Sequence, residues 1–266
     1  MRKRRLVTNL TLLHCLASKM NSVYCVILTV CFCACFAALA LAANASEMKL
    51  FSGPAVSVWD LFPNLQNAFW KKGTQVQVPA PKGKERLEFP SGWGRNSGDE
   101  YTFFAVVMGR KYPIKIDGYV QPHVIWANDS SGALLFYSDG GLNGGYETKF
   151  ISFAGDRVTA TDPTQQVAQD FVAYREKLGI RCDEDPNLYP IGFLDRSHAF
   201  IAAETVHHSV CACYGSIRAY EIDLPSGKIV KAYNQAIAKK MFGGNLPWDL
   251  SKAPNDNWDT DPKSCS

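Results

Sequence analysis

The chain has 266 residues, of which 47% are hydrophobic and 20% charged, a composition typical of a folded globular protein and not of a disordered or collagen-like chain. Its formal net charge of +3 is unevenly distributed, because residues 1–45 hold five basic side chains and no acidic one. The remaining 221 residues carry 23 basic and 25 acidic side chains, a net charge of −2. This balance argues against nucleic-acid binding, which requires a positively charged surface.

The N-terminal segment has the pattern of a leader. Residues 23–43 form a run of 21 uncharged residues that follows a basic cluster at residues 2–5. Two A-x-A patterns favour cleavage after Ala42 or Ala45, so residues 1–45 are predicted to be a signal peptide, with an uncleaved N-terminal membrane anchor as the alternative. Both alternatives place the rest of the chain outside the cytoplasm, periplasmic or secreted, and membrane contact is expected only if the leader is retained. A start at Met20 stays open.

Cysteine usage agrees with export. Five of the nine cysteines lie in the leader, which leaves Cys182, Cys211, Cys213 and Cys265. An even number of cysteines in an exported chain predicts two disulfides. A bridge between Cys211 and Cys213 is disfavoured, because residues i and i+2 of a strand point to the same side and resist disulfide geometry. We therefore expect one of these two to join Cys182 and the other to join Cys265.

The exported part is expected to have three regions. Residues 46–100, rich in Pro, Gly and Lys, are predicted to be an irregular region that packs on the core, with a short helix in 57–62 or 64–72. Residues 101–246 are predicted to be a single α+β domain and residues 247–266 a polar C-terminal tail. Apolar runs rich in β-formers predict strands at 101–108, 119–126, 133–138, 147–153, 157–158, 189–193, 199–203, 216–224 and 229–233.

Two helices have clear signals. Asp162 is a suitable N-cap, Pro163 suits the first helical position, Gln165 completes a capping box, and Gly179 ends the helix. A second helix is expected over 234–242, where it ends at a pair of glycines.

A weak internal repeat has an offset of 66 residues, with Asp129 and Asp195 in matching turns. The segment 125–136 resembles the strand–turn–strand of a β-propeller blade, but two copies at this spacing cannot close a propeller. The expected fold class is therefore α+β: mainly antiparallel β meanders, in two weakly related halves, with two or three helices.

The densest cluster of metal-ligand residue types is His207, His208, Cys211 and Cys213. Its spacing differs from the common zinc patterns, and exported thiols are usually oxidised, so disulfides are favoured and no metal or cofactor is expected. The chain has no G-x-S-x-G, H-E-x-x-H or P-loop motif. Any histidine-based acid or base chemistry must then use one of four residues: His123, His198, His207 or His208.

Two features favour binding to another macromolecule. The loop 138–147 contains four glycines, which allow a partner to approach the backbone closely, and makes Asp139, Asn143 and Tyr146 candidate contacts. A flexible hairpin loop is the alternative. Trp93, and also Trp248 and Trp258, lie in polar surroundings, and tryptophan is a residue type that anchors interfaces. Packing in the core is equally compatible with each of them.

Three functions remain open. The first is an exported envelope protein that binds or inhibits another macromolecule, with a protein as the expected partner and an immunity protein against a toxin or hydrolase as one form. The second is an extracytoplasmic hydrolase whose active site has no sequence motif. The third is a structural or assembly factor of the envelope. We favour the first, because the chain combines an export signal and predicted disulfides with glycine-rich loops and no catalytic motif.

Overall fold

A computed structural model of the protein describes residues 48–64, 73–91, 101–116, 120–138, 145–206, 211–254 and 256–265, without the side chains of residues 120, 121, 248, 249 and 264. The chain divides between Ser46 and Glu47, and every described residue lies in the second unit. Within the described residues, no helix is long and apolar enough to cross a membrane.

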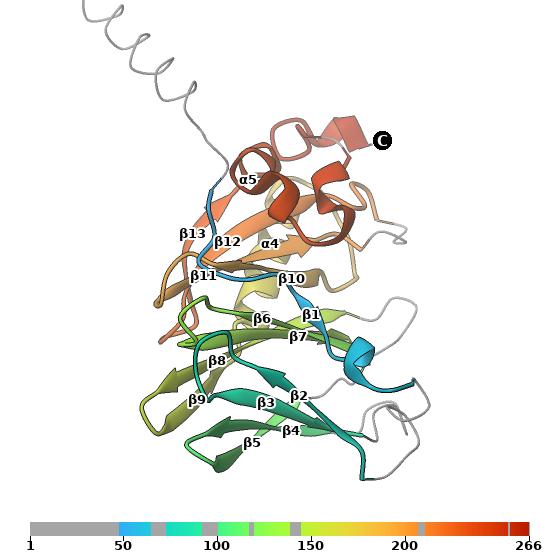
Figure 1. Ribbon diagram of the computed structural model, residues 1–266. Coiled ribbons are helices and arrows are strands. Elements are labelled where there is room, and N and C mark those ends of the chain that lie inside the picture. The colour runs from blue at the N-terminus through green and yellow to red at the C-terminus, as the bar shows by residue number, and fades with distance from the viewer. Residues whose placement is uncertain are drawn as a thin grey trace, which may run out of the picture. The chain divides into compact units, whose positions relative to one another are not determined.

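The fold consists mainly of three antiparallel sheets, accompanied in the described part by two α-helices (Figure 1). The first sheet contains β2 (Gln75–Pro79), β3 (Arg86–Pro90), β4 (Tyr101–Val107) and β5 (Arg110–Ile116). The second contains β1 (Val56–Ser57), β6 (Val120–Trp126), β7 (Gly132–Ser138), β8 (Tyr146–Ala154) and β9 (Arg157–Thr161). The third contains β10 (Asn187–Phe193), β11 (His198–Glu204), β12 (Ile217–Asp223) and β13 (Lys228–Tyr233). The α+β expectation therefore holds in its broad form, with strands predominating.

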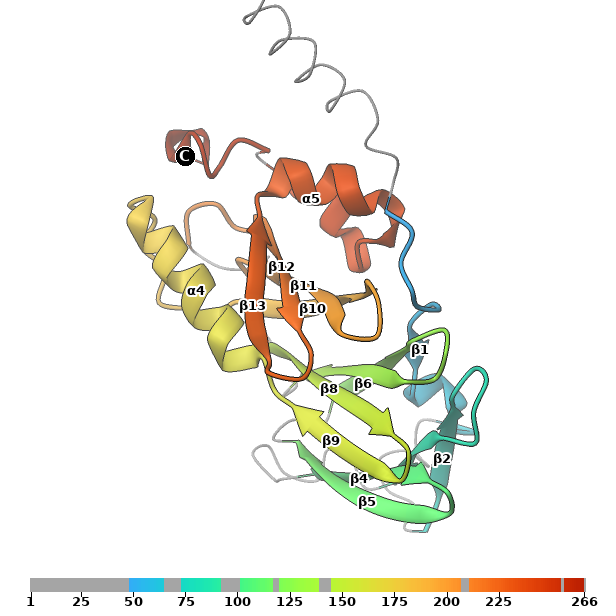
Figure 2. The ribbon, with the colours of Figure 1, turned by 90° about the vertical axis from the view of Figure 1, so that its left-hand side faces the viewer.

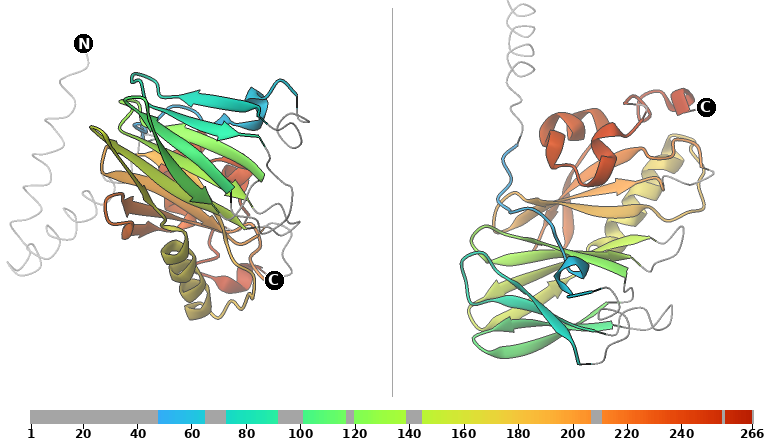
Figure 3. Two further views of the ribbon diagram at one scale, coloured as in Figure 1. Left: turned by 90° about the horizontal axis from the view of Figure 1, so that it is seen from below. Right: turned by 45° about the vertical axis from the view of Figure 1, so that its right-hand side comes forward.

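The sheets are stacked face to face, as Figure 3 shows from two further directions. Alternate residues of each strand point to opposite faces, so one face of each sheet packs against the next. Leu87 and Phe103 of the first sheet share a core with Leu135 of the second, and Leu134 and Phe150 share another with residues of the third. The middle sheet is buried on both faces, which explains why all seven residues of β7 are buried.

The second and third sheets repeat the same strand pairing. Val124 of β6 pairs with Leu135 of β7, and Pro190 of β10 pairs with Ile201 of β11, each 66 residues later. Asp129 Oδ1 accepts the N–H of Ser131 at 3.0 Å, and Asp195 Oδ1 accepts the N–H of Ser197 at 2.6 Å. The described residues form three four-stranded meanders, however, and not two. The third copy, β2–β5, has no matching turn aspartate in its sequence.

The first turns of successive meanders are hydrogen-bonded to each other. Ser130 Oγ accepts the backbone N–H groups of Lys82 and Gly83 at 2.9 and 3.1 Å. On the opposite side of the same turn, Arg196 donates from Nε to Asp129. Burial opposes ionisation of Asp129, but its bonds from Ser131 and Arg196 outweigh burial and lower the pKa of this carboxyl group. These bonds fix the spacing of the three sheets along one edge of the stack.

The predicted capping residues surround helix α4 (Thr164–Lys177), although the cap position differs by one residue. Pro163 occupies the N-cap, and Asp162 Oδ1 accepts the N–H of Thr164 from one position earlier. At the other end Gly179 has a φ of 79°, and the N–H of Ile180 bonds to the carbonyl of Arg175. This is a Schellman ending, which favours glycine because other residues are strained at positive φ.

Helix α5 (Gln235–Phe242) begins where the sequence indicates. Asn234 is its N-cap and accepts the N–H of Ile237. Ala238 and Phe242 pack on Phe200 and Ala219 of the third sheet. Helix α4 packs on the opposite face of that sheet, through Phe171 on Tyr220, as Figure 2 shows from the side.

Residues 46–100 contribute regular structure and not only the irregular region expected. They supply β1, β2 and β3, and Trp59–Leu61 forms the 3₁₀ turn η2 inside the predicted helix 57–62. The alternative helix over 64–72 lies almost entirely outside the described residues. Burial explains why β2 and β3 form. Val78, Leu87 and Phe89 are each almost fully buried, so these strands complete a sheet of which the sequence predicts only β4.

The C-terminal residues pack on the domain, as the expected disulfide to Cys265 requires. They contain 3₁₀ turns at Gly243–Asn245 (η3), Trp248–Lys252 (η4) and Pro262–Cys265 (η5). Trp258 is fully buried between Phe171 and Tyr174, with ring centroids 6.0 and 5.8 Å away. Trp258 is therefore a core residue and not an exposed interface anchor.

The two disulfides form one of the two cysteine pairings that the sequence analysis leaves open. Cys182 is bonded to Cys211, and Cys213 is bonded to Cys265. The first bridge joins the chain after α4 to the turn before β12. The second holds the C-terminal segment against the third sheet.

Candidate binding groove

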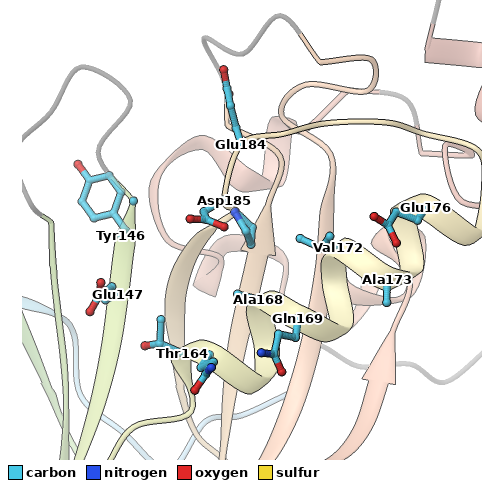
Figure 4. A pocket seen from close by; sticks show the side chains of 13 residues that line it. Tyr146, Glu147, Thr164, Ala168, Gln169, Val172, Ala173, Glu176, Glu184 and Asp185 are labelled. Carbon is cyan, nitrogen blue, oxygen red and sulfur yellow. The ribbon is translucent and has the colours of Figure 1, made fainter.

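An open groove of about 780 Å³ lies between strand β8 and helix α4 (Figure 4). One side is formed by Gly145, Tyr146 and Glu147 of the strand. The opposite side is formed by one face of α4, which contributes the following residues: Thr164, Gln165, Ala168, Gln169, Val172, Ala173 and Glu176. The segment Glu184–Pro186 completes the groove, and we call it the groove wall.

The groove exists because β9 covers only half of β8. The pairing of β8 with β9 runs from Phe150 to Ala154, so the first half of β8 has no neighbouring strand on that edge. Thr164 covers part of this edge, since its hydroxyl accepts the N–H of Thr148 at 3.3 Å and donates to the carbonyl of Thr148 at 3.1 Å. Helix α4 thus starts against the strand and then diverges from it, leaving the groove between them.

The lining of the groove is acidic. Among its thirteen described lining residues, four carry carboxylates, Glu147, Glu176, Glu184 and Asp185, and none is a lysine or arginine. Glu147 comes from the strand, Glu176 from the helix and Asp185 from the wall (Figure 4). The Glu147 carboxylate accepts a hydrogen bond from the Tyr137 hydroxyl at 3.0 Å, and the Glu184 carboxylate lies near the Cys182–Cys211 bridge. Small side chains at Ala168 and Ala173 leave the space between them open. Such a concave, single-sign surface favours ligands of opposite charge.

The groove wall has no helix or strand of its own, and two connections on its inner side hold it. Arg175 of α4 is 1% exposed and donates from Nη2 to the carbonyl oxygen of Glu184 at 3.1 Å. The guanidinium carbon of Arg175 lies 5.0 Å from the centroid of the Phe171 ring. Burial of the guanidinium lowers the pKa of Arg175. The second connection is the disulfide of Cys182, two residues before the wall.

At the strand end of the groove, Tyr146 belongs to a buried polar cluster with Tyr189, Asn187 and Glu204. The two tyrosine rings have centroids 5.1 Å apart. Asn187 accepts the backbone N–H of Tyr146 and donates to Glu204, both at 3.3 Å. Burial, and then the charge of Glu204, raise the pKa of both tyrosines. These contacts fix the position of Tyr146 at the mouth of the groove.

The sequence-based candidates are placed as follows. Tyr146 lines the groove. Trp93, Asp139 and Asn143 lie outside the described residues, as do His207, His208 and the side chain of Trp248.

The two described histidines have other partners. The ring of His198 is bonded to Asp195 at 3.2 Å in the β10–β11 turn. The ring of His123 stacks on Phe136 at 4.7 Å between centroids. Neither of them lines the groove.

One trio of metal-ligand residue types occurs among the described residues: Cys182, Glu184 and Cys211. The two sulfur atoms are bonded to each other, so the trio offers no thiolate pair to a metal ion. Near the C-terminus, Asp256 accepts hydrogen bonds from Lys239 and Gln235, which lower the pKa of its carboxyl group.

Comparison with known proteins finds no matching family model, no matching curated protein and no matching solved structure. The fold and the site define a stack of three antiparallel sheets with an acidic groove at its side.

Proposed function

We propose that the chain from residue 46 onward acts in the envelope as a binding protein that inhibits or neutralises another protein, with an immunity protein against a toxin as the concrete form. The partner places a basic segment in the groove between β8 and α4. The acidic lining of this groove, with no basic side chain among its residues, is the observation that carries the proposal.

The dimensions of the groove suit a peptide segment. From Thr164 to Glu176 its helical side extends over about 18 Å, at about 1.5 Å per residue. An extended segment of about five residues covers that length, at about 3.3 Å per residue. The groove is open along its side, so a segment of a folded partner enters without being threaded.

The predicted export signal and the disulfides support an extracytoplasmic location for the protein. Residues 1–45 have the pattern of a leader, and both described disulfides are of the kind that persists in an oxidising environment. An inhibitor or immunity protein in this compartment meets its target after export.

Removing negative charge from the groove is expected to weaken partner binding. In the variant Glu176→Gln with Asp185→Asn, two exposed groove carboxylates become amides of nearly the same shape. Exposed ion pairs contribute up to about 1 kcal/mol each, so we expect binding to weaken by about tenfold. The measurement is affinity capture of tagged residues 46–266 from the native envelope fraction, followed by titration of the captured partner.

The matched control is Asp60→Asn with Asp261→Asn, which removes the same charge from exposed positions outside the groove. This control is expected to bind the partner as the wild type does. Equal weakening in both variants, or in neither, would contradict the proposal. Persistent association with membrane or wall components would instead favour an envelope assembly factor, and hydrolytic activity that disappears with His123→Ala or His198→Ala would favour a hydrolase.

A further inference from the structure

We propose that the Cys182–Cys211 disulfide is a latch for the acidic groove, so that the groove takes a basic protein segment only after the chain has been oxidised. This inference rests on the proposed function and assigns a regulation to the same site. It gives the two disulfides different roles, since the Cys213–Cys265 bridge holds the C-terminal segment and touches no part of the groove lining.

The geometry places the latch directly behind the groove wall. Helix α4 ends at Lys177, and β10 begins at Asn187, so the segment between them crosses from one side of the groove to the other without regular structure. The bridge fixes Cys182 to Cys211, with the two Cα atoms 5.1 Å apart. The wall residues that line the groove start two positions later, at Glu184.

Without the bridge, the wall is held by non-covalent contacts: the bond from Arg175 Nη2 to the Glu184 carbonyl, the attraction between Arg175 and the carboxylates of Glu184 and Asp185, and the burial of Pro186. Each such contact contributes modestly to stability. A carboxylate oxygen of Glu184 lies within 4.8 Å of the sulfur atoms of Cys182 and Cys211, so the bridge is packed directly against the wall. The bridge is the covalent link that limits how far the wall can move from the helix.

Formation of the latch is an ordinary thiol–disulfide exchange. The thiols of Cys182 and Cys211 lose two electrons and two protons and form one S–S bond, while one disulfide of an exported oxidant protein is reduced to two thiols. A chain that is still reduced, before or during export, thus has the sheets but an unfixed groove wall. The partner is bound only in the compartment where the oxidant acts.

The test compares two double variants, Cys182→Ser with Cys211→Ser, and Cys213→Ser with Cys265→Ser. The bridges close loops of 29 and 52 residues, and because loop-closure entropy grows only with the logarithm of loop length, the two are expected to stabilise the fold to a similar extent. The two variants are therefore matched in lost stability but differ in their connection to the groove. The probe is a fluorescein-labelled peptide of five lysines, titrated by anisotropy at low ionic strength.

We expect Cys182→Ser with Cys211→Ser to weaken peptide binding at least tenfold, and the other variant to bind within about twofold of the wild type. Equal affinity of the two variants overturns the latch. If Cys182→Ser with Cys211→Ser fails to fold, the variant Cys182→Ala with Cys211→Val replaces it, because Cys211 is buried and its site accepts an apolar side chain.

A second readout separates the latch from the proposed function. Amide hydrogen exchange over residues 180–187 is expected to be fast in the variant without the Cys182–Cys211 bridge and slow in the variant without Cys213–Cys265. If the wild type does not bind the peptide, the proposed function fails, and the exchange result still decides the latch. Slow exchange over this segment in both variants overturns it.

Discussion

Replacing Trp258 by alanine is expected to lower the free energy of unfolding by about 3–5 kcal/mol, the usual cost of removing a large buried aromatic ring. Trp258 is fully buried and lies edge-on to Phe171 and Tyr174, at interplanar angles of 67° and 86°. Its loss leaves a cavity between the C-terminal segment and α4. Urea denaturation followed by circular dichroism measures the change.

Two controls define this prediction. Trp258→Phe keeps an aromatic ring at the site and is expected to cost less than the alanine variant. Val230→Ala truncates a side chain that is 54% exposed, and is expected to change stability by less than about 0.5 kcal/mol. A loss below about 1 kcal/mol for Trp258→Ala would mean that the C-terminal segment does not pack on the domain in solution.

Stability is expected to fall steeply above about pH 10. Burial, and then the charges of Glu204 and Asp170, raise the pKa of Tyr189 and of Tyr220 respectively, so both phenols stay protonated in the folded protein. In the unfolded chain they ionise near pH 10. The folded state then holds more protons than the unfolded state, and each tyrosine removes about 1.4 kcal/mol of stability per pH unit above that value. Below about pH 10 this contribution is fully present.

Urea unfolding at pH 8, 10 and 11, completed within minutes of the pH jump, measures this slope. Tyr220→Phe removes one of these ionisations and is expected to reduce the slope by about 1.4 kcal/mol per pH unit. Tyr112→Phe is the control, because the Tyr112 hydroxyl donates to the Asp156 carbonyl at an exposed position. Stability that stays constant between pH 9 and 11 would show that the two phenols are not shielded from water.

Strands with apolar, β-branched sequences could be predicted from the sequence because burial on one or both faces determines their composition. Strands β6 to β13 begin and end within a few residues of the predicted ranges, whereas β1 of the second sheet was not predicted. Helix α4 is indicated by Asp162, Pro163 and Gly179, whose backbone roles are local. Features that depend on a few neighbouring residues are therefore readable without the structure.

The first sheet was largely missed, for physical reasons. Strand β5 begins with the adjacent basic residues Arg110 and Lys111 and contains Pro113, and it pairs only with β4 as the outer strand of the sheet. Strands β2 and β3 are short, and a proline ends each of them. Their membership of a sheet depends on burial against β4 and the second sheet, which no local pattern encodes.

The groove, like the first sheet, could not be predicted from local sequence patterns. Its carboxylates come from three separate segments, at Glu147, at Glu176 and at Glu184 with Asp185, and no spacing in the sequence relates them. Of the binding candidates chosen from sequence, Tyr146 is the one among the described residues that lines the groove. The net charge of −2 over residues 46–266 gave a weak signal, since this slight acidic excess argued against a basic surface without locating an acidic one.

The most direct test of the central claim is site-specific photo-crosslinking from the groove. A photoreactive residue at Ala173, an exposed groove position on α4, is expected to crosslink a basic segment of the captured partner, while the same residue at Asp60 is expected to give no crosslink. Mapping of the crosslinked peptide by mass spectrometry reads the result. A partner that crosslinks at Asp60 and not at Ala173, or an acidic crosslinked segment, would contradict the account.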